Sequence, residues 1–200
     1  MKVLYWLLVP AVAYVLGSLS FSIIISTLFL GRDIRKQGSG NAGATNMARV
    51  FGWAAGGATL AFDFLKAAAA MWLGQKLLGD TGVCLGGIAS MTGHCWPIFH
   101  DFKGGKGISV GAAIGFMIDW RVMVVIVLVF LIVAVASKKV SLGSISAAVA
   151  IIPATWIFAP RPAMLALACF GMVVAITRHK ENIKRLMAGT EPDFKAGKRT

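Results

Sequence analysis

Three short polar segments of the chain carry the residue types that bind phosphate. The first reads GSGNAGATN over residues 38–46 and is followed by Arg49. Glycines let the backbone approach a ligand and present its N–H groups, while Ser, Asn and Thr side chains add neutral hydrogen-bond partners. Arg49 adds a planar cation suited to phosphate. A flexible turn that caps the next helix would also explain this segment, because glycine-rich loops are common.

The second segment reads FKGGKG over residues 102–107 and places Lys103 and Lys106 among glycines, immediately before an apolar run. Amides at a helix N-terminus and lysine ammonium groups both attract an anion. The segment is not a P-loop, because Gly107 follows Lys106 at the position where that motif needs Ser or Thr. The alternative is a positively charged anchor at the surface of a membrane.

The third segment reads RHKENIKRLMAGTE over residues 178–191. A helix here would place His179 and Asn182 on one face, three residues apart. Gly189 would end that helix, and Glu191 would follow it. The alternative is a basic amphipathic helix that lies on anionic lipid headgroups.

The sequence lacks the signatures of a protein nucleophile or a metal site. No G-x-S-x-G elbow occurs, and no histidine is followed five residues later by Asp, the pattern of soluble acyltransferases. Cys84, Cys95 and Cys169 lie far apart in apolar runs, and we expect them to be small buried hydrophobic residues. Asp63 and Lys66 can pair on one helix face within an apolar run, where ionisable groups are costly and often functional.

The composition places these segments in a membrane protein. Of the 200 residues, 58% are hydrophobic and 14% are charged, and the mean hydropathy is +0.77, whereas a soluble domain is about 25% charged. These figures argue against a soluble globular protein, a disordered tail and a disulfide scaffold. The net charge of +12 does not indicate nucleic-acid binding, because the basic residues sit between apolar runs and no nucleic-acid-binding motif is present. The length favours a single domain over residues 1–200.

Seven apolar runs can supply membrane-spanning helices, each of which needs about 20 residues. They cover Val3–Leu30, Phe51–Leu73, Val83–Phe99, Ile108–Ile118, Val122–Ala136, Val140–Phe158 and Met164–Ile176. The fourth, fifth and seventh runs are short, and short spans cross by recruiting flanking residues or thinning the bilayer. The sequence therefore predicts an all-α integral membrane protein with seven transmembrane helices.

The basic residues predict the orientation of these helices. Of the twenty Lys and Arg residues, fifteen fall on one set of alternate loops and the C-terminal tail. They are Arg32, Arg35, Lys36, Arg49, Lys103, Lys106, Lys138, Lys139, Arg178, Lys180, Lys184, Arg185, Lys195, Lys198 and Arg199. Because positively charged loops stay in the cytoplasm, we expect these loops and the C-terminus to be cytoplasmic and the N-terminus to be outside. All three polar segments then face the cytoplasm.

Taken together, the segments resemble one family. The chain is similar over nearly its whole length to the bacterial acyl-phosphate:glycerol-3-phosphate acyltransferases, which are small integral membrane enzymes. The matching stretches are GSGNAGATN at 38–46, GHCWPIFHDFKGGKG at 93–107 and RHKENIKRLMAGTE at 178–191. The runs AFDFLK at 61–66 and SLGSI at 141–145 also fit this family.

The resemblance implies a reaction in phospholipid synthesis. Glycerol 3-phosphate and an acyl phosphate, rather than acyl-CoA or acyl carrier protein, would give 1-acyl-glycerol 3-phosphate (lysophosphatidate) and phosphate. The enzyme would lie in the lipid of the bacterial cytoplasmic (inner) membrane, face the cytoplasm, and be coupled functionally to the enzyme that makes acyl phosphate. Because the sequence shows no metal-site pattern, we expect it to need no metal or other cofactor. An acyl phosphate is already activated, so that the protein can act by orientation and electrostatics without its own nucleophile.

The matched motifs also assign candidate site residues. The expected catalytic residues are Ser39, Arg49, Lys106, His179, Asn182 and Glu191. The expected substrate- and phosphate-binding residues are Gly38, Gly40, Asn41, Thr45, Asn46, Lys103, Gly104, Gly105 and Gly107. In this assignment Arg49 and Lys106 bind phosphate and neutralise developing charge, while Asn182 orients the glycerol. Glu191 orders the tail or binds a glycerol hydroxyl, and either His179 or a substrate phosphate oxygen takes the hydroxyl proton.

A transporter or binding protein for a phosphorylated metabolite is the alternative function. Basic loops and an Asp–Lys pair within a span would serve transport too. Transporters often contain inverted repeats, and no convincing repeat relates the two halves of this chain. A purely structural membrane subunit would leave the three polar segments unexplained. Uptake of labelled glycerol 3-phosphate into sealed vesicles without an acyl donor separates transport from catalysis.

Overall fold

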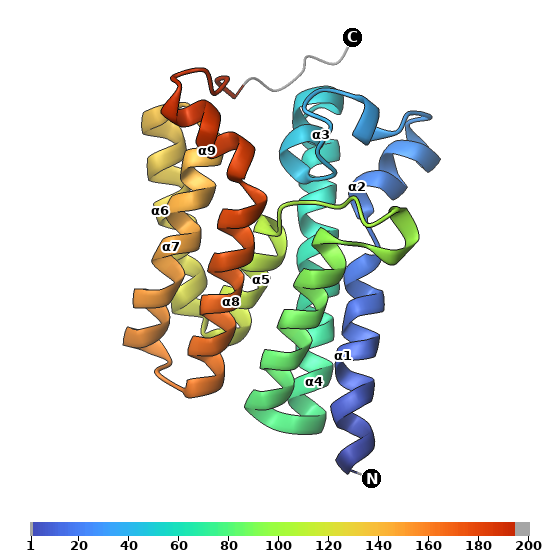
Figure 1. The fold of residues 1–200 in the computed structure, drawn as a ribbon, viewed down its shortest axis with the longest axis vertical. Helices are drawn as coiled ribbons and strands as arrows, with labels where there is room; N and C mark the ends of the chain where they lie inside the picture. The colour runs from blue at the N-terminus through green and yellow to red at the C-terminus, as the bar shows by residue number, and fades with distance from the viewer. Residues whose placement is uncertain (1, 195–200) are drawn as a thin grey trace.

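The computed structural model describes residues 2–194, and within that part of the chain every regular element is helical (Figure 1). The α-helices are α1 (Lys2–Ser18), α2 (Phe21–Ile24), α3 (Ala44–Phe51), α4 (Trp53–Cys95), α5 (Ile108–Ile118), α6 (Trp120–Ser137), α7 (Val140–Phe158), α8 (Pro162–Arg178) and α9 (Lys180–Met187). A π-helical turn covers Ile25–Phe29, and short 3₁₀ turns cover Ile34–Lys36 and Ile98–His100.

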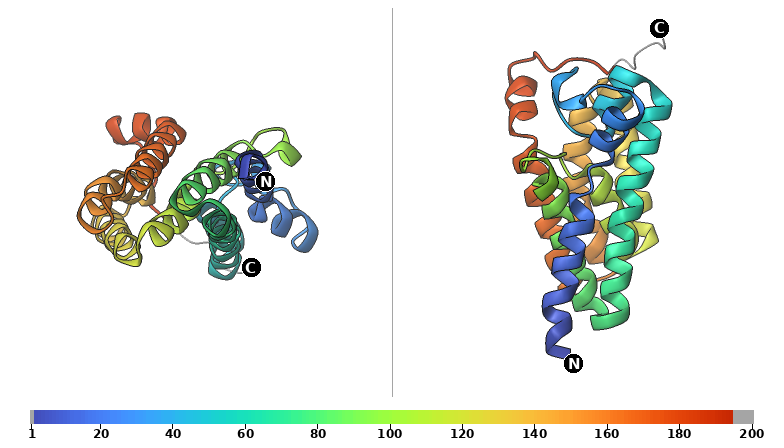
Figure 2. Two further views of the ribbon diagram at one scale, coloured as in Figure 1. Left: turned by 90° about the horizontal axis from the view of Figure 1, so that it is seen from below. Right: turned by 90° about the vertical axis from the view of Figure 1, so that its right-hand side faces the viewer.

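The helices form two groups that meet at α5 and where α8 packs against α4. Helix α1 packs along α4 on one side, and α6, α7 and α8 pack together on the other. Helix α5 contacts α4, α6 and α8, and it lies between the two groups when the bundle is viewed along its axis (Figure 2). Helices α3 and α9 cover one end of the bundle, whereas α1 begins at the opposite end (Figure 1). The first and the third polar segments therefore lie at the same end of the bundle.

Helix α4 consists of two arms that reverse direction at Gly79. The sequence predicted a loop over residues 74–82, but helix continues on both sides as far as Gly79, where φ is 61° and ψ is −140°. The two arms correspond to the second and third apolar runs. They lie side by side and form much of the surface against which α1 packs (Figure 1).

The first apolar run, Val3–Leu30, is interrupted where the sequence predicted a continuous helix. Helix α1 ends at Ser18, whose Oγ donates to the carbonyl of Tyr14, 2.8 Å away. The next carbonyl, that of Leu19, accepts a hydrogen bond from the Lys66 side chain on α4. A side chain from another helix thus binds this backbone oxygen at the interruption, a contact that the apolar pattern alone does not reveal.

The bundle has the apolar exterior of a membrane protein. Among the described residues, three stretches are long and apolar enough to cross a membrane: Val3–Phe29, Trp120–Ser137 and Val140–Phe158. Helices α8 and α9, bent by 60°, make a fourth if they count as one span. Large apolar side chains such as Val135 on α6 and Trp156 on α7 are 75% and 66% exposed. The seven-pass count and its orientation remain predictions.

Candidate active site

A cavity of about 1320 Å³ lies where the three polar segments meet. Thirteen of the fifteen predicted site residues line it. They are Ser39, Gly40, Asn41, Thr45, Asn46, Arg49, Lys103, Gly104, Lys106, Gly107, His179, Asn182 and Glu191. Gly38 and Gly105 lie outside the lining: a side chain at Gly38 would meet the Asn46 side chain, and one at Gly105 would meet the His94 ring.

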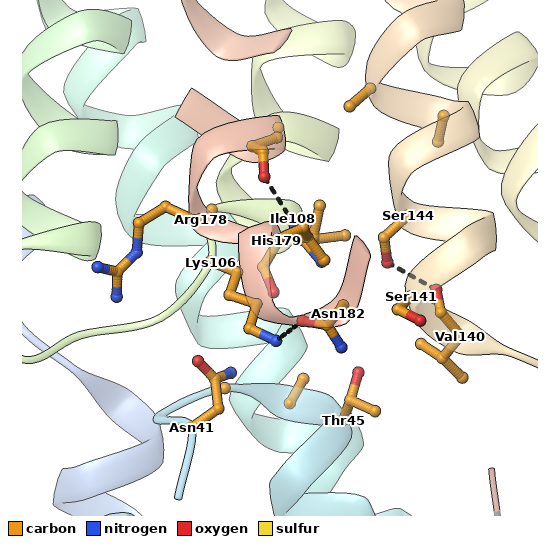
Figure 3. Close-up of a pocket in the computed structure, with 18 of the residues that line it drawn as sticks. Asn41, Thr45, Lys106, Ile108, Val140, Ser141, Ser144, Arg178, His179 and Asn182 are labelled. Atoms are coloured by element: carbon orange, nitrogen blue, oxygen red, sulfur yellow. Dashed lines mark hydrogen bonds between the residues drawn. The ribbon is translucent and has the colours of Figure 1, made fainter. Parts of the chain in front are cut away.

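Lys106 stands at the N-terminus of α5 and points into the cavity (Figure 3). The residue that follows it, Gly107, has φ of +82°, a left-handed conformation that glycine adopts without strain. The Lys106 ammonium donates to Oδ1 of Asn182 on α9. Burial, followed by repulsion from Arg185, lowers the pKa of Lys106 to about 8. The predicted pairing of a basic glycine loop with a helix start is therefore present.

Glu191 joins α9 to α7. Its Oε1 accepts from Asn182 Nδ2 at 2.7 Å and from Ser141 Oγ at 2.6 Å, while its Oε2 accepts from Arg185 Nε at 2.7 Å. The main-chain carbonyl of Glu191 also accepts from the Lys139 ammonium. Burial raises the pKa of Glu191, but the three hydrogen bonds together hold it below the ordinary value. The carboxylate is thus ionised at neutral pH and holds Asn182 in place.

Ser141 is a site residue that the motif assignment missed. It lies in the first turn of α7 and contributes a hydroxyl hydrogen bond to Glu191 across the cavity. The only sequence signal for it was the SLGSI run at 141–145, which fitted the family without an assigned role. Its partner is fifty residues away in the chain, so that spacing could not connect the two.

His179 occupies the bend between α8 and α9 and is only 3% exposed. Its Nδ1 lies 2.7 Å from the carbonyl oxygen of Ala175. Because a carbonyl only accepts, Nδ1 carries the proton, and Nε2 of the neutral ring is free to accept one. Burial lowers the pKa of His179 to about 4, so the ring is neutral at physiological pH.

The first polar segment is shaped by Asn46. Its Oδ1 accepts from the Ser39 N–H at 2.9 Å, and its Nδ2 donates to the carbonyls of Gln37 and Asn41 at 2.9 and 3.1 Å. Asn46 is therefore engaged mainly with its own loop. By contrast, Asn41 and Thr45 lie across the cavity from Lys106 and Asn182 (Figure 3).

Two arginines differ in how they are held. Arg178 donates to the carbonyls of Gly104 and Gly105, at 3.1 and 3.2 Å, and its guanidinium lies 5.4 Å from the centre of the Trp96 ring. It therefore supports the loop that carries Lys106. The Arg49 side chain on α3 forms no hydrogen bond or ion pair with any residue between 2 and 194. Its guanidinium is thus available to an anion in the cavity.

The cavity continues as an apolar channel between α5, α6, α7 and α8. Its walls are formed by aliphatic and aromatic side chains from all four helices: Ile114, Ile126, Val127, Phe130, Leu131, Ala147, Ala148, Ile151 and Met172. The polar end and the apolar channel belong to one continuous space. Such a space suits an amphiphilic molecule with an anionic head and a long hydrocarbon chain.

The polar end carries an excess of positive charge. Arg49, Lys106, Arg178 and Arg185 line it together with the carboxylate of Glu191, and α3 and α5 begin beside it. Helix N-termini and unpaired cations both favour a phosphate. Within residues 2–194 no group of three or more His, Cys, Asp or Glu side chains is arranged to hold a metal ion.

Comparison of the sequence with known proteins finds similarity to glycerol-3-phosphate acyltransferases. The sequence model for glycerol-3-phosphate acyltransferase matches residues 7–189. The glycerol-3-phosphate acyltransferase of Thermoanaerobacter sp. (strain X514) is 37% identical over 98% of both chains. Glycerol-3-phosphate acyltransferase 2 of Moorella thermoacetica is 40% identical over 98% of this chain and all of its own length.

Two solved structures are also similar to this chain. Both are crystal structures of PlsY (YgiH), an integral membrane glycerol 3-phosphate acyltransferase. The glycerol 3-phosphate form has a TM-score of 0.90 and 34% sequence identity, and the lysophosphatidic acid form has a TM-score of 0.88 and 33% identity. Each alignment covers 94% of this chain and 95% of the other.

Proposed function

The chain belongs to the glycerol-3-phosphate acyltransferase family, and from this premise we propose that it transfers an acyl group from an acyl phosphate to the sn-1 hydroxyl of glycerol 3-phosphate. The products are 1-acyl-glycerol 3-phosphate and inorganic phosphate. The two similar PlsY structures are a glycerol 3-phosphate form and a lysophosphatidic acid form, and these two molecules are the acceptor and the product of the proposed reaction. The acyl phosphate donor is inferred from the resemblance of the sequence to the bacterial acyl-phosphate:glycerol-3-phosphate acyltransferases.

The observation that carries this proposal is the convergence of all three polar segments on one cavity with an apolar channel. Arg49 and Lys106 bind the two substrate phosphates, and the N-termini of α3 and α5 add their partial positive charge. Ser39, Asn41 and Thr45 line the same end and offer neutral hydrogen-bond groups. The apolar channel holds the acyl chain.

The proposed step is direct acyl transfer. The primary hydroxyl oxygen of glycerol 3-phosphate attacks the acyl carbonyl carbon and forms the new ester C–O bond. The bond between the carbonyl carbon and the bridging phosphate oxygen breaks. Phosphate leaves with the bonding electron pair. Because this leaving group is already good, the protein has only to orient the two substrates and stabilise the negative charge that develops. Lys106 and Arg49 supply that stabilisation, and no side chain is acylated.

Asn182, Glu191 and His179 act on the acceptor. Glu191 fixes the Asn182 amide through the 2.7 Å hydrogen bond, and Asn182 orients the glycerol beside Lys106. His179 Nε2, which is unprotonated in the neutral ring, takes the hydroxyl proton. A phosphate oxygen is the competing acceptor, and substitution of His179 separates the two.

The site is proposed to face the cytoplasm of the bacterial inner membrane. The cationic loops of the cavity lie at the α3 and α9 end of the bundle (Figure 1), and positively charged loops remain on the cytoplasmic side. Glycerol 3-phosphate then reaches the site from the cytoplasm, where the enzyme that makes acyl phosphate also supplies the donor.

A comparison of donors tests the proposed function. Purified protein in detergent is given glycerol 3-phosphate with either palmitoyl phosphate or palmitoyl-CoA, and the lipid products are separated by chromatography. We expect lysophosphatidate only with palmitoyl phosphate. Equal or faster product formation from palmitoyl-CoA contradicts the proposed donor while leaving the acyltransferase assignment intact.

A further inference from the structure

Three ionisable side chains form a buried cluster beneath the loop that carries Lys106. This Asp63–Lys66–His94 cluster joins the arms of α4, since Asp63 and Lys66 lie on the first arm and His94 near the end of the second. The Lys66 ammonium is 2.7 Å from Asp63 Oδ1 and 3.3 Å from His94 Nδ1. The Lys66, Asp63 and His94 side chains are 4%, 1% and 3% exposed.

His94 forms the floor of the Lys106 loop. Its carbonyl accepts from the Gly105 N–H at 3.1 Å, and the Cys95 carbonyl accepts from the Gly104 N–H at 3.3 Å. A Cβ atom at Gly105 would lie 2.3 Å from His94 Nε2, so that only glycine allows the loop to rest on this ring. Because Gly105 immediately precedes Lys106, the position of the His94 ring fixes the backbone from which Lys106 extends.

The other side of the cluster is tied to the interruption after α1. Lys66 donates to the carbonyl of Leu19, the residue that follows the end of α1. One ammonium group therefore links α1, both arms of α4 and, through His94, the Lys106 loop. Asp63 and Lys66 are not part of the cavity lining, so that neither touches a substrate held there.

Stability alone does not explain this cluster. A buried ion pair contributes little net stability compared with apolar residues of similar size, and ionisable groups inside a membrane protein are usually kept for function. We propose that the Asp63–Lys66–His94 cluster is a positioning device that holds the His94 ring, and hence the Gly105 backbone, so that Lys106 is aimed at the substrate phosphates. This inference rests on the proposed function, in which Lys106 binds phosphate.

A double-mutant cycle tests the inference. Asp63→Asn/Lys66→Met removes both charges together and leaves no unpaired buried charge. It is measured alone and in a Lys106→Arg background, for kcat/KM with glycerol 3-phosphate and palmitoyl phosphate and for melting temperature in detergent. We expect about tenfold lower kcat/KM when Lys106 is present and less than about threefold when it is Arg, because contacts that act through one residue are not additive.

The matched control is Asp80→Asn/Arg161→Met. It removes the 2.6 Å ion pair between the Gly79 turn and the turn before α8, at the opposite end of the bundle. We expect kcat/KM within about twofold of its parent in both backgrounds, since sites far apart behave independently. A similar loss in the control would overturn the inference, because it would show that kcat/KM responds to any lost ion pair.

Two results would overturn the inference: an unchanged kcat/KM in the cluster variant, or losses of equal size in both backgrounds. If the cluster variant does not fold, His94→Gln removes the ring beneath Gly105 and its contact with Lys66 but keeps both charges of the Asp63–Lys66 pair, and the same two criteria apply to it. The wild-type protein is measured in the same assay. If it forms product, the proposed function stands, and a negative result with the cluster variant counts only against the positioning inference.

Discussion

The protonation state of Lys106 depends on its surroundings in the site. Burial and nearby arginines lower its pKa to about 8. In the free protein, the Lys106 ammonium therefore gives up its proton and its positive charge as the pH rises through that value. The protonated form is the one that binds phosphate. We therefore predict that kcat/KM falls about tenfold between pH 7 and pH 9, as expected for one titrating group. The measurement is the pH profile of kcat/KM with both substrates.

The matched variant for this prediction is Lys106→Arg. Arginine stays protonated over the whole range, so the profile of this variant is expected to be flat between pH 7 and pH 9 at a lower overall level. A wild-type profile that stays flat between pH 7 and pH 9 contradicts the assignment of phosphate binding to the Lys106 ammonium.

His179 gives a second prediction at the level of one residue. If Nε2 takes the hydroxyl proton, His179→Gln keeps a polar side chain but loses the base, and kcat is expected to fall about a hundredfold, the lower end of a general base contribution. The KM for glycerol 3-phosphate is expected to change little. A loss below about fivefold assigns the proton to a phosphate oxygen of the substrate.

The sequence identified the residue types of the site better than their individual contacts. Glycines, lysines and amides in the three polar segments predicted the lining of the cavity, and most of them line it. The use of the Asn46 amide by its own loop and the contact of Gly105 with the His94 ring could not be predicted. Both contacts join groups that are brought together only when the helices pack and the loops fold against them.

At the level of elements, the hydrogen bond between Ser141 and Glu191 is expected to hold α7 against the segment after α9. Ser141→Ala leaves the buried carboxylate with one donor fewer, and a hydrogen bond to a charged group is worth about 1.5–3 kcal/mol. We predict a lower free energy of unfolding by that amount and reduced kcat. Denaturant or thermal unfolding in detergent measures the first, and steady-state kinetics measures the second.

Thr155→Val is the matched control on the same helix. The Thr155 hydroxyl donates to the carbonyl of Ile151 in its own helix and lies outside the cavity lining. Its loss is expected to cost about 1 kcal/mol or less and to leave kcat unchanged. Equal effects of the two substitutions would show that Ser141 has no special connection to Glu191.

The channel between α5, α6, α7 and α8 predicts a dependence on acyl-chain length. Ala148 lines this channel on α7, whereas its neighbour Val149 is 49% exposed on the outer face. Ala148→Phe is expected to lower kcat/KM for palmitoyl phosphate about tenfold more than for a short-chain acyl phosphate, because overpacking shortens the channel. Val149→Phe is the control and is expected to change neither value. Equal losses for both donors would place the acyl chain elsewhere.

Apolar runs predicted where helices form but not where they break. Helices α5, α6, α7 and α8 follow their predicted runs closely, since each of these helices is apolar along its whole length. The interruption after Ser18 involves a hydrogen bond from Lys66 on α4, and the reversal at Gly79 occurs within a segment that the sequence assigned wholly to a loop. Both features involve contacts or backbone angles that an apolar pattern does not encode.

At the level of the whole molecule, the charge distribution predicts seven passes with the C-terminus in the cytoplasm. Single cysteines placed at Asp80 and at Lys138, in a background without the three native cysteines, report opposite sides of the membrane. We expect a membrane-impermeant thiol reagent added to intact cells to label the first position and to leave the second unlabelled. Labelling of both positions from one side contradicts this topology.

The central claim is direct acyl transfer from acyl phosphate to glycerol 3-phosphate at the cationic end of the cavity. The most direct test is release of inorganic phosphate from palmitoyl phosphate by the purified protein, with and without glycerol 3-phosphate. We predict release only when glycerol 3-phosphate is present, with one phosphate for each lysophosphatidate formed. A burst of phosphate equal to the protein concentration without glycerol 3-phosphate would contradict the claim, because it would show that a side chain of the protein is acylated first.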